Sequence, residues 1–270
     1  MKCTHVERPR KSLLNLIRGP EVYGVRMTLH TDIAQPWKGP RYERGIVAGL
    51  KVFIFGESAP RKEWDARKSP RGISEERVSE YVEHLENDGN PGRFIFFSTV
   101  DQVLIAAIEG AASVATNEQR IEFWNSVAFT NLVPGLVDGK PSAEQWSSVA
   151  AEFAGQIRAL MPHLVLVFSS EGDRHIPESV RQDGSTEGSR YIDITKSEGL
   201  KCPKESKAYI FGHEDKHRTL YGNVFHPSGM LPRSGTPLSA EGWVPWVKQL
   251  VGWAGELKET GAVKVSGRVF

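Results

Sequence analysis

The chain has 270 residues, of which 39% are hydrophobic and 25% charged, and its formal net charge is +1 at pH 7. This is the balance of an ordinary globular protein that can bury a sizeable core. No apolar run approaches the roughly 18 residues that a membrane span needs, and a charge so near zero gives no overall sign of nucleic-acid binding. The amino terminus also lacks the charged-then-apolar layout of a signal peptide, so we expect a soluble, cytoplasmic protein.

The number of cysteines excludes two further classes of protein. Cys3 and Cys202 are the only cysteines in the sequence. Two cysteines cannot build a disulfide framework, and they cannot supply the four thiolates of an iron–sulfur cluster. We therefore expect a chain that folds without either.

The pattern along the chain divides it into an extension and one domain. Residues 1–45 mix basic residues, prolines and short apolar pieces, which indicates an amino-terminal extension packed on the domain. Over residues 46–270, buried apolar runs alternate with amphipathic segments. Strands are predicted at 49–56, 164–170 and 207–212 and, each together with the polar turn that ends it, at 126–134 and 219–229. Helices are predicted at 73–88, 100–115, 142–163 and 238–257.

Local signals refine two segments and suggest the fold. Ser142 is the predicted cap of the helix at 142–163, and Pro162 is expected to stop it. Residues 171–207 are rich in Gly, Ser, Lys and Glu, which is typical of a long surface excursion. Because strands alternate with helices, we predict an α/β fold, a three-layer α/β/α sandwich around a central, mostly parallel sheet.

Polar turns follow three of the predicted strands. They are "GESAP" after the first strand, "TNLVP" after the second and "HPSG" after the last. In open parallel sheets, ligands bind beyond the carboxyl ends of the strands. We therefore expect Glu57, Ser58, Asn131 and His226 to converge on one crevice.

The turn at residues 56–60 is close to an esterase nucleophile elbow. In G-x-S-x-G, the serine lies on a sharp turn between a strand and a helix, and Ser58 would be the nucleophile. Here the last position is Pro60, which disfavours helical angles at Ala59. A serine hydrolase therefore remains only an alternative interpretation.

The stretch "HEDKH" at residues 213–217 satisfies the zinc-protease pattern H-E-x-x-H. That chemistry requires the motif within a helix, so that His213 and His217 share one face. Strand-like runs lie directly on both sides of the motif and leave little room for a helix. We therefore predict no metal site.

Five motifs, in this order, resemble those of the uracil-DNA glycosylase superfamily. The family pattern has a strand ending in Gly-Glu or Gly-Gln, a downstream aromatic residue, a strand ending in asparagine, a helix and strand pair, and a late His-Pro-Ser motif. The resemblance covers roughly residues 50–255. The matching stretches are "FIFGESAP", "GRFIFFS", "AFTNLVP", "QIRALMPHLVLVFSS" and "VFHPSG".

The resemblance implies a monofunctional DNA glycosylase that acts on an extruded base without a metal or organic cofactor. Its catalytic residues would be His226, which donates a hydrogen bond to the departing base, together with Glu57 and Ser58 of the water-placing first motif. Its base-binding residues would be Gly56, Asn131, which reads the polar edge of the base, and Phe96, which stacks on it. Phe94 and Phe97 are the alternatives to Phe96.

The resemblance also implies DNA as the partner, single- or double-stranded, and a monomeric protein. A loop after His226 would lie against the DNA backbone, and a wedge residue, Leu231, would enter the space that the base leaves. A basic run at 61–71 either contacts phosphates or is only a solvated face. The predicted DNA-binding residues are Ser170, Pro227, Ser228, Gly229, Leu231 and Arg233.

One departure from the family pattern leaves a second hypothesis open. Where the best-known uracil enzymes have an aspartate, this chain has Ser58, so that Glu57 is left to position water. A catalytically inactive member that only binds nucleic acid is therefore the alternative to a glycosylase. Each residue also has an ordinary structural interpretation: His226 as a strand-end histidine, Asn131 as a turn residue and Phe96 as part of the core.

Overall fold

The computed structural model of the chain describes most of the region after residue 34. The described residues belong to one unit, Asp32–Phe270. They are 35–60, 73–110, 114–169, 171–172, 174–176, 191–193, 206–212, 217–224, 226–227, 240–265 and 267–270.

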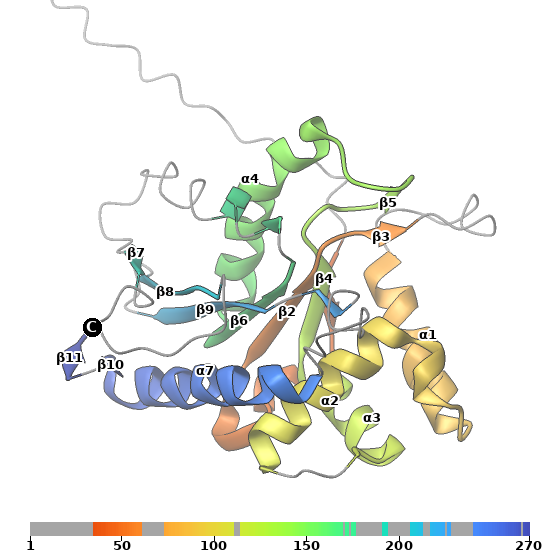
Figure 1. Cartoon of the computed structure of the whole chain (residues 1–270), viewed down its shortest axis with the longest axis horizontal. Coiled ribbons are helices and arrows are strands. Elements are labelled where there is room, and N and C mark those ends of the chain that lie inside the picture. The colour runs from red at the N-terminus through yellow and green to blue at the C-terminus, as the bar shows by residue number, and fades with distance from the viewer. Residues whose placement is uncertain are drawn as a thin grey trace, which may run out of the picture. The chain divides into compact units, whose positions relative to one another are not determined.

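Groups of strands and groups of helices follow one another along the described chain (Figure 1). The strands are β1 (Trp37–Lys38), β2 (Val52–Gly56), β3 (Ala59–Pro60), β4 (Ala128–Asn131), β5 (Leu136–Val137), β6 (Leu164–Phe168), β7 (Tyr191–Asp193), β8 (Ala208–Gly212), β9 (Arg218–Val224), β10 (Lys264–Val265) and β11 (Arg268–Val269). The α-helices are α1 (Ile73–Glu86), α2 (Ile95–Glu109), α3 (Asn117–Ser126), α4 (Ala143–Leu160) and α7 (Ala240–Thr260). Short 3-10 helices are η1 (Tyr42–Arg44), η2 (Val47–Gly49) and η5 (Pro91–Arg93).

Seven strands form the central sheet, in the order β1-β4-β2-β6-β9-β8-β7. The four middle strands, β4, β2, β6 and β9, are parallel. β1 is antiparallel at one edge, and β8 and β7 are antiparallel at the other. The predicted α/β fold with a mostly parallel sheet is therefore confirmed.

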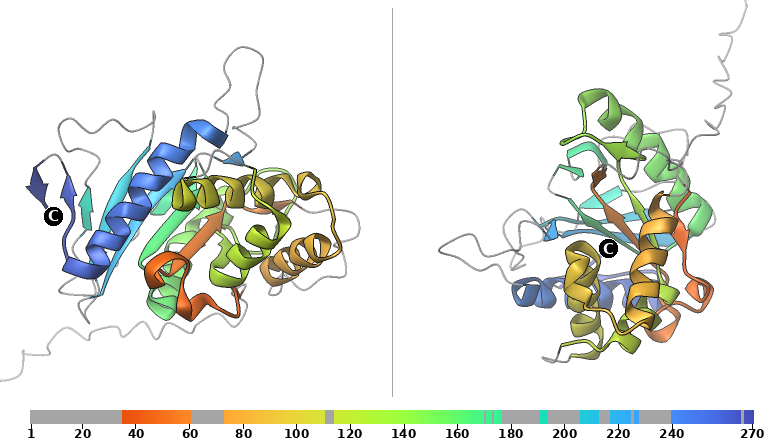
Figure 2. Two further views of the ribbon diagram at one scale, coloured as in Figure 1. Left: turned by 90° about the horizontal axis from the view of Figure 1, so that it is seen from below. Right: turned by 90° about the vertical axis from the view of Figure 1, so that its right-hand side faces the viewer.

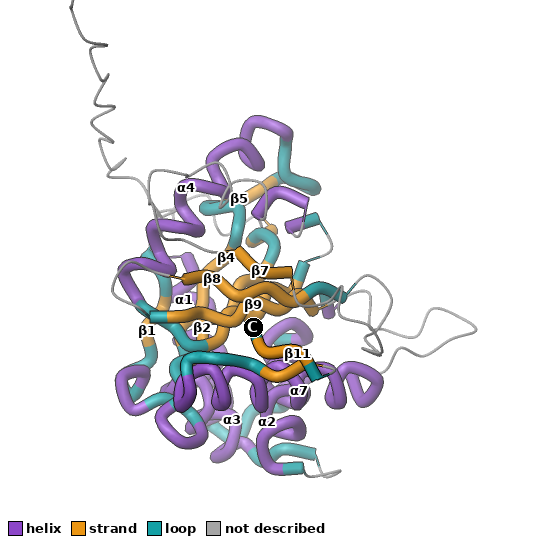
Figure 3. The backbone as a smooth tube through the Cα atoms, turned by 90° about the vertical axis from the view of Figure 1, so that its left-hand side faces the viewer, coloured by secondary structure: helices purple, strands orange, loops and turns teal. Residues whose placement is uncertain are grey.

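Side chains of β2 show how the two faces of the sheet are covered. Val52 and Ile54 belong to a core shared with α1, α2, α3 and α7. Phe53 and Phe55 belong to the opposite core, which α4 covers. Buried parallel strands need an apolar layer on both faces, and this alternation supplies it. The arrangement is compatible with a three-layer α/β/α sandwich (Figures 2 and 3).

The longest predicted interior helix begins and ends as its local signals indicate. The Ser142 hydroxyl accepts the Gln145 N–H at 3.3 Å, and the Gln145 side chain accepts the Ser142 N–H at 2.8 Å. This capping box satisfies donors that a helix start leaves free. The helix ends before Met161, which has a positive φ of 47° and precedes Pro162. The prediction of Ser142 as the cap is confirmed.

Two helices differ from the sequence-based expectation. α2 begins at Ile95 rather than near residue 100, and it ends where Gly110 adopts a left-handed φ of 69°. α3 was not predicted because its segment, "NEQRIEFWNS", has too few apolar residues to show a helical stripe. A capping box between Thr116 and Gln119 was the local signal that could have revealed it.

The edges of the sheet come from segments for which no strand was predicted. β1 lies within the expected extension, 1–45, and pairs with β4; residues 1–34 are outside the described residues. β7 lies within the expected excursion, 171–207, and pairs with β8. No helix in the described part of the chain is long and apolar enough to span a membrane.

A buried ion pair joins the helices on one face of the sheet. The Asp101 carboxylate of α2 accepts hydrogen bonds from Tyr81 Oη of α1 at 2.8 Å, from Trp124 Nε1 of α3 at 3.1 Å and from the Arg120 guanidinium of α3. Arg120 also donates to the Ser98 carbonyl at 2.9 Å. Because Asp101 and Arg120 are almost fully buried, this network fixes α2 relative to α1 and α3.

His163 makes stability depend on pH at the amino ends of the strands. Its Nδ1 accepts the Lys51 N–H at 3.0 Å. Burial, and then the nearby charges of His217, Lys258 and Lys51, lower the pKa of His163 from 6.5 to about 4. The unfolded chain therefore binds more protons between these two values, and stability should fall as pH drops from 6.5 towards 4. We expect a loss of about 1 kcal/mol, since the ring is partly exposed.

Urea unfolding of the wild type and of His163→Gln at pH 7.5 and pH 4.5 measures this effect. Glutamine can accept the same N–H but does not titrate, so the variant should lose less stability than the wild type between the two pH values. Equal losses in the two proteins would show that His163 is not the titrating group.

Candidate functional site

The predicted site residues Glu57, Asn131 and His226 lie where parallel strands end. The chain passes from β2 to β4 on one side and later to β6 and β9 on the other, so the strand order reverses between β2 and β6. Such a switch point is the usual place for a ligand in an open parallel sheet. Glu57 directly follows β2 and Ser169 directly follows β6, and Ser169 Oγ donates to Glu57 Oε2 at 2.7 Å across this point.

A cavity of about 400 Å³ opens at these strand ends, and we call it the site cavity. Its volume is toward the lower end of the range for small-molecule pockets. All four side chains that were expected to converge line it, and so does Phe96. The lining residues are Glu57, Ser58, Ala59, Arg77, Arg93, Phe94, Ile95, Phe96, Phe97, Phe129, Asn131 and His226.

Gly56 is needed for a close approach between two of these residues. It pairs with Asn131 across the parallel strands β2 and β4. A Cβ atom at position 56 would lie 2.5 Å from Asn131 Oδ1 and 3.2 Å from Phe96 Cζ. Any larger residue would therefore displace the Asn131 amide or the Phe96 ring. Gly56 shapes the site cavity through the absence of a side chain.

Backbone contacts hold the loops after β2 and β4 together. The Leu132 N–H donates to the Gly56 carbonyl at 2.9 Å, and the Val133 N–H donates to the Glu57 carbonyl at 3.0 Å. Beyond them, β3 and β5 form a short parallel ladder. Glu57 and Asn131 are thus carried on two mutually braced loops, which is the rigidity that a preorganised site requires.

Ser58 does not lie on a nucleophile elbow. The chain enters β3 at Ala59, directly after Ser58, and does not begin a helix there. An elbow needs the turn between a strand and a helix, because that turn exposes the serine. The serine-hydrolase interpretation thus lacks the local geometry on which it depended.

One oxygen of the Glu57 carboxylate accepts a hydrogen bond from a buried hydroxyl group. Ser169 is fully buried, and its Oγ donates to Glu57 while accepting the Gly172 N–H at 2.8 Å. Because the Ser169 oxygen accepts the Gly172 N–H, its own proton points at the Glu57 carboxylate. The Glu57 carboxylate is thus oriented, and it lines the site cavity as an acceptor.

His226 lies against the aromatic wall of the site cavity. Its ring centroid is 5.7 Å from that of Phe96, and the two planes are tilted by 40°. Burial lowers the pKa of His226, and the charge of Glu57 opposes this effect. The imidazole is therefore neutral at pH 7 and carries one N–H donor.

Phe96 has partners that fix its ring at the edge of the core. Its ring contacts those of Phe97, Phe129 and Phe168 at centroid distances of 5.4, 5.7 and 6.2 Å. The side chain stays partly exposed and lines the site cavity. The alternatives Phe94 and Phe97 line it too.

The predicted DNA-binding residues are mostly outside the described residues. Pro227 is described, is buried and does not line the site cavity. The predicted positions that the structure does not describe are Ser170, Ser228, Gly229, Leu231 and Arg233.

Three residues at the site were not identified from the sequence. Ser169 directly follows the apolar run of β6, so its position indicated a site residue as strongly as the position of Ser170 did. Arg93 and Arg77 line the site cavity from η5 and α1. Arg93 stands inside the quoted "GRFIFFS" stretch, but Arg77 has no local signal, since it is one of many charged residues on α1.

The H-E-x-x-H stretch falls between two antiparallel strands. β8 ends at Gly212 and β9 begins at Arg218. His217 Nε2 lies 2.8 Å from the Pro162 carbonyl oxygen, and residues 213–216 are outside the described residues. Across the described ranges, no group of three or more His, Cys, Asp or Glu side chains could hold a metal ion.

Comparison with known proteins does not assign a family. The chain matches no model of a known protein family. It also has no significant match among curated proteins. The function is therefore inferred from the geometry of the site cavity and from the motifs that form it.

Proposed function

We propose that the protein is a DNA glycosylase that hydrolyses the N-glycosidic bond of an extruded uracil or a related damaged or modified base. One observation carries the proposal: side chains from four distant segments, Glu57, Phe96, Asn131 and His226, line one cavity. They supply an acceptor, an aromatic face, an amide and a neutral imidazole. These are the groups that hold and release a flipped base.

The reaction assigns a role to each polar group. The bond between the sugar C1′ and the base nitrogen breaks, and its electron pair leaves with the base. The sugar becomes oxocarbenium-like, and a water oxygen then bonds to C1′. Glu57, oriented by Ser169, accepts a proton from that water. His226 donates to the base oxygen as negative charge develops there.

The remaining residues recognise the base. Among the described residues, the Asn131 amide has no hydrogen-bond partner, so that its donor and acceptor can pair with the edge of a base. Phe96 offers a face on which the base can stack. The likeness of the motifs to those of uracil-DNA glycosylases supports the same assignment.

A base-release assay tests the proposal. The protein is incubated with single-stranded and duplex oligonucleotides that contain uracil, hypoxanthine or a modified cytosine, and alkali then cleaves abasic sites. We expect strand scission with at least one of these bases and none with the unmodified oligonucleotide. Folded protein that cleaves nothing on this panel would contradict the proposal. Salt-dependent binding without release would favour an inactive nucleic-acid-binding protein.

A further inference from the structure

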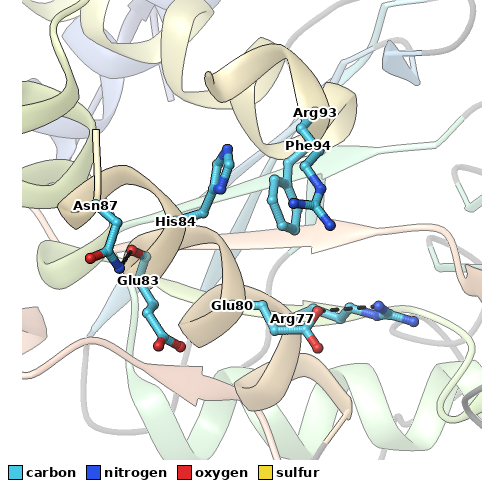
Figure 4. A pocket seen from close by; sticks show the side chains of 7 residues that line it. All are labelled: Arg77, Glu80, Glu83, His84, Asn87, Arg93 and Phe94. Carbon is cyan, nitrogen blue, oxygen red and sulfur yellow. Dashed lines mark hydrogen bonds and ion pairs between the residues drawn. The ribbon is translucent and has the colours of Figure 1, made fainter. Parts of the chain in front are cut away.

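A second cavity, of about 380 Å³, lies beside the site cavity and is lined largely by α1 (Figure 4). We call it the α1 cavity. Arg77, Arg93 and Phe94 line both cavities, so that the two share a wall. An extended ligand with one group in the site cavity can therefore place its next group in the α1 cavity.

Arg93 lies at the shared wall, where its positive charge can bind an anionic ligand. It is exposed, and its guanidinium carbon lies 5.9 Å from the centre of the Phe94 ring. No acidic partner of Arg93 occurs among the described residues. Arg77 differs, because its side chain is only 12% exposed and pairs with Glu80 at 3.3 Å. An anion between the two cavities would thus be bound by Arg93.

The rest of the α1 cavity combines aromatic rings with an acceptor. The rings of His84 and Phe94 lie 5.3 Å apart between centroids. His84 Nε2 bonds the Asn90 carbonyl at 3.0 Å, which braces the turn before Phe94. The exposed Glu83 carboxylate has no partner among the described residues and offers acceptor oxygens.

We propose that the α1 cavity binds the nucleotide next to the extruded one. Arg93 contacts the phosphate that joins the two nucleotides, and the neighbouring base lies against Phe94 and His84. An amino group on that base donates to Glu83, as cytosine N4 donates to acidic side chains elsewhere. This inference rests on the proposed function. It adds that the protein should bind more tightly when the nucleotide next to the extruded one is dC than when it is dT.

Equilibrium binding tests the inference without requiring catalysis. Fluorescence anisotropy is measured with short single-stranded oligonucleotides that carry one uracil flanked by dC or by dT, over a series of salt concentrations. Arg93→Ala should weaken binding by about tenfold and reduce the salt slope by about 0.7, the value for one lost phosphate contact on a single strand. Arg93→Lys, which keeps the charge, should restore the slope.

Two further variants complete the experiment. Arg268→Ala removes another exposed arginine, on β11 and on the opposite side of the domain from α1, and should leave affinity and slope unchanged (Figure 1). Glu83→Gln should bring the affinities for the dC and dT flanks closer together. If Arg93→Ala behaves like Arg268→Ala, or if the wild type does not distinguish the flanks, the inference is wrong.

Base release measured in parallel separates the two proposals. Binding that follows these expectations, without release of any base, would overturn the proposed function and leave the α1 cavity as a nucleotide site. Base release together with an unaffected Arg93→Ala variant would overturn the inference alone.

Discussion

His226→Ala should bind a uracil-containing oligonucleotide as the wild type does but release the base about a hundredfold to a thousandfold more slowly. That factor is the usual cost of removing one preorganised donor from a site where charge develops. The neutral His226 ring lies against Phe96 inside the site cavity. Its hydrogen bond strengthens only as the bond to the sugar breaks, so that the loss falls on the rate and not on affinity.

Single-turnover base release and anisotropy on the same oligonucleotide measure the two effects separately. His226→Gln, which keeps an N–H donor, should recover part of the rate. His163→Gln replaces a histidine at the opposite ends of the strands, and at pH 7.5 it should behave as the wild type. An undiminished rate in His226→Ala, or an equal loss in binding, would contradict the assigned role.

Asp101→Ala should lower the free energy of unfolding by about 3–5 kcal/mol, the cost of leaving one partner of a buried ion pair alone. Asp101 is fully buried and accepts hydrogen bonds from Tyr81, Trp124 and Arg120. Without it, the buried Arg120 guanidinium loses its counter-charge. The effect should also reach the site cavity, because Phe96 lies on the same helix, α2.

Urea unfolding monitored by circular dichroism measures this loss. Glu86→Ala removes an exposed carboxylate from α1 and should change stability by less than about 0.5 kcal/mol. The double variant Asp101→Leu, Arg120→Met removes both charges and should be more stable than Asp101→Ala alone. A loss of under about 1 kcal/mol in Asp101→Ala would show that the network contributes little.

The site residues that come at the ends of strands could be predicted from the sequence. Glu57, Asn131 and His226 each come at the end of an apolar run, and parallel pairing brings such ends to one edge of a sheet. Ser169 was missed because nothing local separates it from Ser170. Arg77 and Arg93 were missed as site residues because they reach the site cavity from α1 and η5 by packing, and packing leaves no mark in local sequence.

By itself, the sequence determined where most strands and helices lie, because hydrophobic periodicity and capping residues act within a few positions of the chain. The continuous apolar run at 164–170 also indicated an interior strand, and β6 is buried over its whole length. Only the tertiary structure decided the strand order, the edge strands β1 and β7, and the placement of α3. These depend on contacts between residues far apart in the chain, such as Asp101 with Arg120 and Glu57 with Ser169, whose partners exist only once the chain has folded.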